Sequence, residues 1–325
     1  MVSETLILEA TRARFSDRAW SSVGEIPGGG SDRRYFRVTG DDAASWIVMH
    51  YTDARADNAK FEPATETLRR IGVAVPEIHG GLAYEDGTGL LWMDDLGDAT
   101  LLSRKAEPWE RDLAPLYRAT LEAVAPLHRC GVEDLEEDER SLLEPPFDDA
   151  LYQWEQDYFF DHFVGQLLDG KGANLRDDPS LQEIVSRLAD EPRRLVHRDF
   201  QSQNVMVTSA ESVVLIDYQG LRSGLPEYDL ASLLWDPYVG LSASQRDQMI
   251  TFHWSLLGMN GDADDQRRLR LCTGQRLMQA LGAYANLSIN LGKPEFREHV
   301  APAFAALQEL ADDEPLLACL RKLDL

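Results

Sequence analysis

The chain has 325 residues, 44% of them hydrophobic, which is enough to build one large domain or two modest ones around a real core. Asp and Glu total 56 against 32 Lys and Arg, and this formal net charge of -24 argues against nucleic acids and anionic membranes as partners. The three cysteines are scattered, which excludes a disulfide framework and a CxxC metal site.

The amino-terminal stretch is unlike a signal peptide, because Glu4 and Glu9 interrupt its apolar residues. No window approaches the roughly 18 uninterrupted apolar residues that a membrane-spanning helix needs. We therefore expect a cytoplasmic protein with no membrane partner, present as a monomer or a weak dimer.

The first hundred residues favour strands around one internal helix. Alternating apolar residues indicate strands, and the 3.6-residue spacing of apolar residues indicates helices. The predicted elements are a helix within 1–20, strands at 35–38 and 45–51, a helix over 59–71, and two strands within 73–97 joined by a turn at 85–89.

The rest of the chain is mainly helical, apart from two short strands expected within 195–217. The predicted helices lie at 109–129, 146–168, 181–189, 230–234, 243–257, 263–287 and 296–310. This order predicts an α+β fold with two lobes, a β-rich lobe over 1–97 and a mainly helical lobe over 98–325. The cleft between them is expected near residues 92–98.

The string "HRDFQSQN" at 197–204 fits H-R-D-x-x-x-x-N, the catalytic-loop pattern of phosphotransfer in kinases. In that pattern Asp199 orients the acceptor hydroxyl and takes its proton, while Asn204 offers an amide oxygen to Mg²⁺. A hairpin from "NVMV" to "VVLID" brings Asp217 beside Asn204 as a second oxygen ligand. The full string favours kinase chemistry over a surface hairpin with polar caps.

Other polar residues around this string are expected to support it. His197 and Arg198 more plausibly brace the loop than take part in the chemistry. Asp229, in the following predicted helix, is expected to hydrogen-bond the loop.

A glycine-rich stretch at 28–34, "GGGSDRR", is the candidate nucleotide loop, because glycines let backbone N–H groups approach phosphates closely. A flexible turn would have the same sequence, so its place before a strand of the first lobe carries the assignment. Met93 and Asp94, at the end of "LLWMDD", are expected to present backbone groups to adenine. The candidate loop residues are Gly28, Gly29, Gly30, Ser31, Arg33 and Arg34.

The strand "WIVMHY" lacks the Lys that clamps nucleotide phosphates in kinases. His50 stands at the aligned position, and the nearest Lys is Lys60. Positive charge is then expected from Arg33, Arg34 or Arg37, or in part from His50. The helix acids at positions 62 and 66, both Glu, are left without their usual partner, and surface placement explains them equally well.

The acceptor is expected to lie over the catalytic loop, against helices of the second lobe. Trp154, Glu155 and Tyr158 supply rings and a carboxylate suited to a sugar, although aromatic residues at this spacing are also typical of a core. Arg222 and Asp236 follow the metal-binding Asp in sequence. Arg222 is suited to a substrate carboxylate such as a lactyl group, or is an ordinary surface Arg.

The order and spacing of these motifs match a known family over nearly the whole chain. The matching segments are "GVAVPEI", "MDDLGDATL", "APLHRCG", "LVHRDFQSQNVMV", "LIDYQG" and "YDLASLLWDPYV". The chain resembles the aminoglycoside phosphotransferase-like and choline-kinase-like small-molecule kinases, which have a protein-kinase-like fold. "RRYFRV", the Lys-free "IVMHY" and "RLMQALGAYANL" are most similar to bacterial kinases that phosphorylate the anomeric hydroxyl of N-acetylmuramate or N-acetylglucosamine.

The resemblance implies ATP and Mg²⁺ as cofactors, Asp199 as catalytic base, and Asn204 and Asp217 as magnesium ligands. It also implies that the 28–34 loop covers the ATP phosphates. The A-P-E motif of protein kinases does not follow. Asp229 comes only twelve positions after Asp217, which is too few for the long activation loop and peptide platform of protein kinases, so a protein substrate is not expected.

Two other functions remain open from the sequence. The negative charge and the aromatic residues also suit an aminoglycoside or choline-like amino-alcohol kinase. The missing Lys also suits an inactive nucleotide-binding regulatory module.

Overall fold

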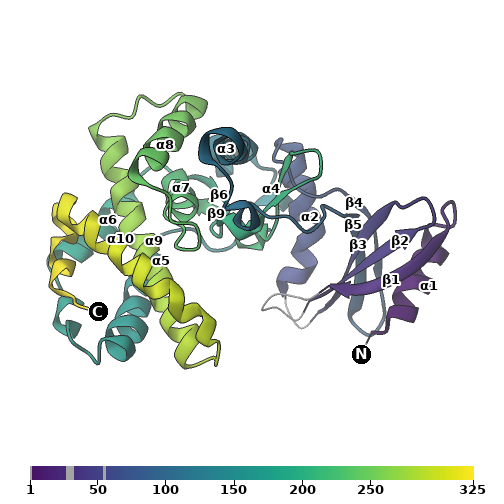
Figure 1. Cartoon of the computed structure of the whole chain (residues 1–325), viewed down its shortest axis with the longest axis horizontal. Helices are drawn as coiled ribbons and strands as arrows, with labels where there is room; N and C mark the ends of the chain where they lie inside the picture. Colours follow the sequence, from purple (N-terminus) through teal and green to yellow (C-terminus); the bar gives the residue numbers. More distant parts are fainter. Residues whose placement is uncertain (1, 27–32, 54–55) are drawn as a thin grey trace.

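The computed structural model describes residues 2–26, 33–53 and 56–325. It consists of a sheet-rich amino-terminal part and a mainly helical carboxy-terminal part (Figure 1), which confirms the predicted fold class. The first part is a five-stranded antiparallel sheet in the order β1-β2-β3-β5-β4. Its elements are α1 (Glu4–Arg14), β1 (Trp20–Ile26), β2 (Arg34–Gly40), β3 (Ser45–Thr52), α2 (Ala56–Arg70), β4 (Ile78–Ala83) and β5 (Thr88–Asp94).

The two faces of this sheet have different neighbours, because successive side chains of a strand point to opposite sides. One face packs against α1, where Ile7 meets Phe36 and Trp92 in a buried cluster. The indole of Trp92 donates a hydrogen bond to the Thr11 hydroxyl of α1 at 2.9 Å. The other face carries Tyr35 and the alternate residues of the neighbouring strands toward the helical part.

The strand β1 was not among the predicted elements. It is an edge strand paired only with β2, with Val23 opposite Val38, and most of its residues are exposed. An edge strand without a buried face leaves little hydrophobic alternation in the sequence, so "WSSVGEI" gave no strand signal.

The second part is built from helices with short strands among them. Its α-helices are α3 (Ala114–Arg129), α4 (Glu137–Arg140), α5 (Asp149–Tyr158), α6 (Pro179–Asp190), α7 (Pro226–Leu234), α8 (Ala243–Leu257), α9 (Ala263–Ile289) and α10 (Val300–Asp313). The short 3₁₀ and π segments are η1 (Leu102–Arg104), η2 (Trp109–Leu113), η3 (Val132–Asp134), η4 (Phe159–Leu167), η5 (Ala173–Leu175), η6 (Ser202–Asn204), η7 (Tyr218–Gly220), η8 (Pro294–His299) and η9 (Pro315–Lys322). None of the helices in the described ranges combines the length and apolarity needed to cross a membrane.

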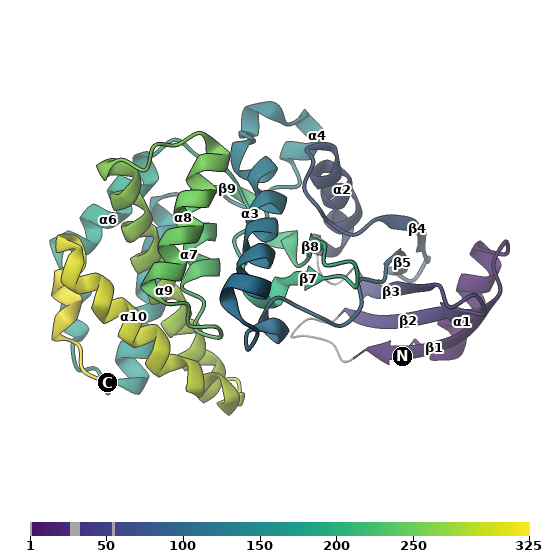
Figure 2. The same ribbon diagram turned by 45° about the horizontal axis from the view of Figure 1, so that its top comes forward.

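The short strands of the second part form two pairs, β6 (Arg194–Val196) with β9 (Arg222–Gly224) and β7 (Val205–Val207) with β8 (Val213–Leu215). The β7–β8 hairpin confirms the predicted one and lies where the helical part meets the sheet (Figure 2). The strand β9 was not predicted, because its three residues are too few to show an alternating pattern.

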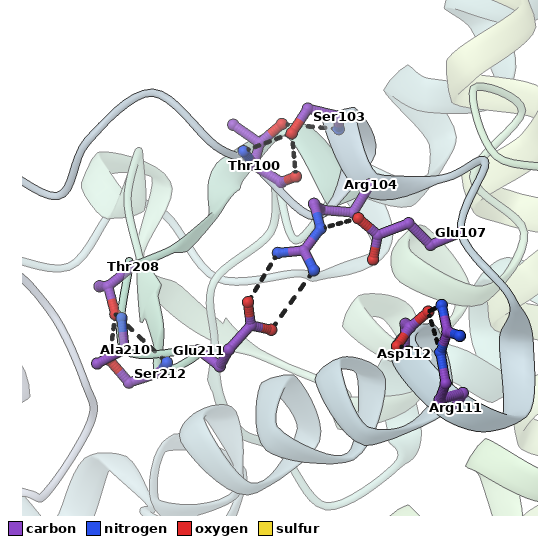
Figure 3. A network of polar contacts seen from close by, with 10 residues as sticks. All are labelled: Thr100, Ser103, Arg104, Glu107, Arg111, Asp112, Thr208, Ala210, Glu211 and Ser212. Carbon is purple, nitrogen blue, oxygen red and sulfur yellow. Dashed lines mark hydrogen bonds and ion pairs between the residues drawn. The ribbon is translucent and has the colours of Figure 1, made fainter.

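The linker that follows β5 pairs with the same hairpin. The amide of Leu101 donates to the carbonyl of Val205, and that of Val207 to the carbonyl of Ala99, each at 2.8 Å. Arg104 lies between Glu107 and Glu211, which belongs to the hairpin turn (Figure 3). The hairpin is therefore tied to the chain that leaves the sheet, and we propose a lobe boundary here, at residues 97–98.

The helix α2 contacts both parts. The Thr65 hydroxyl lies 2.6 Å from the hydroxyl of Tyr218, and the ring of Phe61 packs against the Tyr218 ring at 5.4 Å. The ammonium of Lys60 pairs with Glu144 of the second part at 3.0 Å. These contacts fix α2 relative to the segment that follows β8.

Candidate active site

A cavity of about 780 Å³ lies between the sheet and the helical part. Its size is within the usual range for small-molecule sites. Met93 and Asp94 line it from β5, and the β7–β8 region lines it from the other side. Asp199, Asn204 and Asp217, which are far apart from Met93 in sequence, share this wall.

Asp199 lies in the segment between β6 and β7, with part of its carboxylate exposed to the cavity. The guanidinium of Arg198 donates to Asp199 Oδ2 at 2.8 Å. Arg198 has a φ of 75°, a left-handed conformation that is unusual for a residue with a side chain. Such backbone strain persists only where the surroundings hold it, and it is common at functional sites.

Asn204 and Asp217 are brought together by the hairpin, in which Val205 is paired with Leu215. The Asn204 amide nitrogen donates to the carbonyl of Asp199 at 2.8 Å and lies 3.5 Å from Asp217 Oδ2. These bonds orient the amide group and leave its oxygen for another partner. Burial raises the pKa of the Asp217 carboxyl, and the nearby Asp199 raises it further. A cation between Asn204 and Asp217 would offset that repulsion.

The donor set fits Mg²⁺, which usually takes one or two protein carboxylates and completes its shell with phosphate oxygens and water. In the part of the chain that the structure describes, no cluster of three or more His, Cys, Asp or Glu side chains forms a closed metal cage. One carboxylate and one amide oxygen at an open cavity therefore suit a metal ion shared with a phosphorylated ligand.

The loop at 197–204 is held by Asp229 of α7, a helix whose residues are all buried. Asp229 accepts hydrogen bonds from the backbone amides of His197 at 2.7 Å and Arg198 at 2.8 Å. It also lies 3.0 Å from the Nε2 atom of His128. The His197 ring in turn contacts the carbonyl of Ile216 at 3.0 Å, so it links the loop to the hairpin.

Asp236 holds the other end of the loop. One oxygen accepts from the Ser202 amide at 3.0 Å and from its hydroxyl at 2.5 Å, and the other accepts from the Tyr238 amide at 3.0 Å. The side chain is buried, at 2% exposure. This geometry favours a bracing role and does not support the expected contact with the acceptor.

The other expected acceptor residues lie on α5 and β9. Trp154 is 48% exposed and stacks on Tyr158 at 5.1 Å, and neither ring lines the cavity. Glu155 is 1% exposed, with its oxygens bonded to Tyr228 at 2.6 Å and Gln275 at 3.1 Å. These contacts engage the Glu155 carboxylate within the protein, so its expected role at the acceptor gains no support.

Glu155 predicts a pH dependence of stability. Burial raises the pKa of its carboxyl above the usual 4.5, although the hydrogen bonds from Tyr228 and Gln275 oppose the shift. A raised folded-state pKa stabilises the fold below 4.5, and this contribution is lost as pH rises through the folded value. The free energy of unfolding of Glu155→Gln, relative to wild type, should therefore increase from pH 5 to pH 8. Urea denaturation at both pH values measures it, and a pH-independent difference would contradict this.

Arg33, which is 6% exposed, lines the same cavity. Its Nε donates to the Asn58 side chain of α2 at 2.6 Å, and its guanidinium lies 5.8 Å from the Phe61 ring centre. With its amide oriented to satisfy both neighbours, Gln219 donates to Asp217 Oδ1 at 2.9 Å and accepts from Arg33 Nη1 at 3.3 Å. The side chain of Gln219 therefore links Arg33 to Asp217, the candidate metal ligand.

Arg34 and His50 lie on the opposite face of the sheet. They are cross-strand partners, and Arg34 binds both oxygens of Glu25 at 2.7 Å. Neither residue lines the cavity, so their expected contact with the phosphates is not supported. Arg37 does line the cavity, where it pairs with Asp95 at 2.6 Å and Asp98 at 2.8 Å.

Some expected residues lie outside the described part of the chain, and some residues at the cavity were not expected. Gly28, Gly29, Gly30 and Ser31 lie outside the described residues. The residues at positions 62 and 66, both Glu, are exposed on α2. Asn58 and Phe61 were missed, because only the packing of α2 brings them to Arg33. Gln219 was missed as well, because its bridge from Asp217 to Arg33 depends on the same packing.

A two-part fold with the 197–204 loop and the β7–β8 hairpin at the cavity between its parts is typical of phosphotransferases. The model of the phosphotransferase enzyme family matches residues 22–272, and the chain belongs to this family. The fold class and the family stated from the sequence motifs are both confirmed.

The similar proteins of known name agree with this assignment. The N-acetylmuramate/N-acetylglucosamine kinase of Pseudomonas putida is 28% identical over 327 residues, which cover 95% of this chain and 91% of that protein. A GDP complex of aminoglycoside 2'-phosphotransferase-IIIa has a TM-score of 0.65 at 14% identity, covering 93% of this chain and 98% of the other. An amicoumacin kinase bound to AMP-PNP and Ca²⁺ has a TM-score of 0.61 at 13% identity, covering 92% of this chain and 93% of the other. The two solved structures share the fold.

Proposed function

We propose that this protein is an ATP- and Mg²⁺-dependent kinase that phosphorylates the anomeric hydroxyl of N-acetylmuramate or N-acetylglucosamine. The observation that carries the proposal is the meeting of Asp199, Asn204 and Asp217 at one wall of the cavity. The name of the Pseudomonas putida relative supports the amino-sugar acceptor. We place the activity in the cytoplasm, in peptidoglycan recycling, with the protein acting as a monomer or a weak dimer.

In this mechanism Asp199 orients the acceptor hydroxyl and accepts its proton, and Arg198 holds the carboxylate in place. Asn204 and Asp217 would hold Mg²⁺, which supplies charge neutralisation for the transferring phosphoryl group. The protein contributes mainly position and electrostatic stabilisation, because phosphoryl transfer in line needs little covalent help.

Arg33 is our candidate for the positive charge that a strand Lys supplies in protein kinases. Its bond to Asn58 and its contact with Phe61 fix the guanidinium through α2. A guanidinium held in this way is suited to phosphate, because its planar donors can form two parallel hydrogen bonds. Met93 and Asp94, which line the cavity from β5, are candidates for the adenine site.

Removing this charge is expected to weaken nucleotide binding. Arg33→Met should raise the KM for ATP by about tenfold or more, since a charge-assisted hydrogen bond is worth roughly 1.5–3 kcal/mol. Arg34→Met is the matched control, because its guanidinium pairs with Glu25 on the other face of the sheet. Initial rates at varied ATP measure both. Equal effects of the two substitutions would exclude a phosphate role for Arg33.

A panel of acceptors tests the proposed function. The protein is incubated with ATP and Mg²⁺ plus N-acetylmuramate, N-acetylglucosamine, choline or kanamycin, and ADP release is followed. Turnover with the amino sugars alone supports the proposal. Turnover only with choline or kanamycin would instead identify an amine-bearing acceptor. ATP binding with no acceptor turned over would indicate an inactive nucleotide-binding module.

A further inference from the structure

Arg222 of β9 is a buried guanidinium without a carboxylate partner. It is 9% exposed, its Nε donates to the carbonyl of Gly220 at 3.0 Å, and its guanidinium lies 5.4 Å from the centre of the Phe147 ring. Among the described residues no other group accepts a hydrogen bond from it, and its two terminal nitrogens are not fully covered by protein atoms. Buried charges are normally paired, so this guanidinium suits an anionic ligand.

Arg222 adjoins the end of the cavity that contains the candidate base. Its hydrogen-bond partner, Gly220, lines the cavity, and so does Glu144, which forms an isolated β-bridge with Arg222. Arg198 lines the cavity beside them, since an atom at the Cβ position of Gly220 would lie 3.2 Å from Arg198 Cδ. Two guanidinium-bearing side chains therefore contact Gly220, next to Asp199.

The charges at this end of the cavity do not cancel. Arg198 pairs with Asp199 at 2.8 Å, and Lys60 pairs with Glu144 at 3.0 Å. These two pairs leave the charge of Arg222 uncompensated among the residues that the structure describes here. The positive excess is local, because the whole chain has a formal net charge of -24. An anion beside Arg222 is attracted by both Arg222 and Arg198, and the negative charge of Asp199 offsets only one of these cations.

The electrostatic surroundings of Arg222 agree with an anion site. Burial lowers the pKa of its guanidinium, and the positive charge of Arg198 lowers it further, while Asp199 and Glu144 raise it. The protein's own groups therefore disfavour the charged form of Arg222 on balance. A bound carboxylate would oppose this shift, since a nearby opposite charge favours the charged form.

We propose that Arg222, together with the cavity-lining Arg198, binds a carboxylate of the acceptor, so that the preferred substrate is an acidic amino sugar. This rests on the proposed function and specifies its substrate class. N-acetylmuramate carries such a carboxylate on its lactyl group, whereas N-acetylglucosamine has none. A guanidinium and a carboxylate form a charge-assisted pair, which is among the stronger hydrogen bonds in proteins.

The test compares N-acetylmuramate with its methyl ester, which removes the negative charge and keeps the rest of the sugar. We expect the KM of the wild-type protein to be about tenfold or more higher for the ester. In Arg222→Gln the ratio of the two KM values should fall below about threefold, because the remaining charge of Arg198 is balanced by Asp199. Arg222→Lys keeps the charge without the planar fork and should retain part of the preference.

Arg194→Gln is the matched control. Arg194 lies on β6, the strand that pairs with β9, and its guanidinium forms an exposed ion pair with Glu133 at 3.5 Å. This variant should keep the wild-type preference for the acid, since exposed ion pairs contribute little. The KM for ATP separates an acceptor carboxylate from a nucleotide phosphate as the bound anion, and in Arg222→Gln it should stay within about threefold of wild type.

The outcomes separate this inference from the function on which it rests. Equal KM values for acid and ester in wild-type protein overturn it, and this result requires no variant to fold. It is also overturned if Arg222→Gln keeps the full preference, or if this variant raises the KM for ATP instead of the KM for the acid, which would assign the site to a nucleotide phosphate. If neither sugar is phosphorylated, the proposed function itself fails, which the acceptor panel detects independently.

Discussion

Replacement of Asp199 by Asn is expected to lower kcat for phosphoryl transfer by roughly 10²–10⁴-fold, the usual contribution of a positioned general base. The amide keeps the size of the side chain and its contact with Arg198 but has far less capacity to accept a proton. Because the nucleotide would be held by other residues, the dissociation constant for ATP should change by less than about threefold. Single-turnover transfer and equilibrium ATP binding measure the two quantities separately.

The control for Asp199 is Asp312→Asn, an exposed carboxylate of α10 that is 3.8 Å from Arg321. It should keep wild-type kcat, since exposed ion pairs contribute little. An Asp199→Asn protein that turns over at a rate similar to this control would contradict the base assignment, whatever the acceptor is.

Replacement of Asp229 by Ala is expected to cost about 3–5 kcal/mol of stability and to lower activity. The substitution leaves the buried amides of His197 and Arg198 and the ring of His128 without their common acceptor. Buried unsatisfied donors are expensive, and here they belong to the segment that positions the catalytic loop. The free energy of unfolding from urea denaturation, together with kcat, measures the effect.

Asp229→Asn is the informative comparison, because its one remaining oxygen can accept part of the same set of hydrogen bonds. It should lose less stability than the Ala variant and keep more activity. If the Ala variant unfolds within about 0.5 kcal/mol of wild type, the three hydrogen bonds do not hold the loop as the geometry implies.

The β7–β8 hairpin was predicted well because the pattern that defines it is local. The spacing from Asp199 to Asn204 fixes a loop, and two short apolar runs with a turn between them define the return to Asp217. The structure confirms the β7–β8 pairing that follows from this pattern. The family motifs lie in the same segments, so resemblance and local physics gave the same fold.

Which of the expected basic residues would line the cavity was harder to predict, because it depends on the faces of strands. Arg33 and Arg34 are adjacent in sequence, yet the pleat directs one to the cavity and the other to Glu25. The same alternation puts His50 opposite Arg34, away from the cavity. A shift of one residue in the assumed strand exchanges these roles, and a single sequence does not fix that register.

The acceptor side depends on contacts between helices far apart in the chain. Glu155 was expected at the acceptor, yet the structure joins it to Tyr228 and Gln275. Asp236 was expected there as well, yet its carboxylate accepts hydrogen bonds from Ser202 and Tyr238.

The most direct test of the central claim is the identity of the product formed from ATP, Mg²⁺ and N-acetylmuramate. We predict a sugar phosphate whose phosphorus is coupled to the anomeric proton in phosphorus–proton NMR spectra, formed by wild-type protein and absent with Asp199→Asn. Phosphate on a different hydroxyl, or transfer to choline or kanamycin with the amino sugar left intact, would contradict the account.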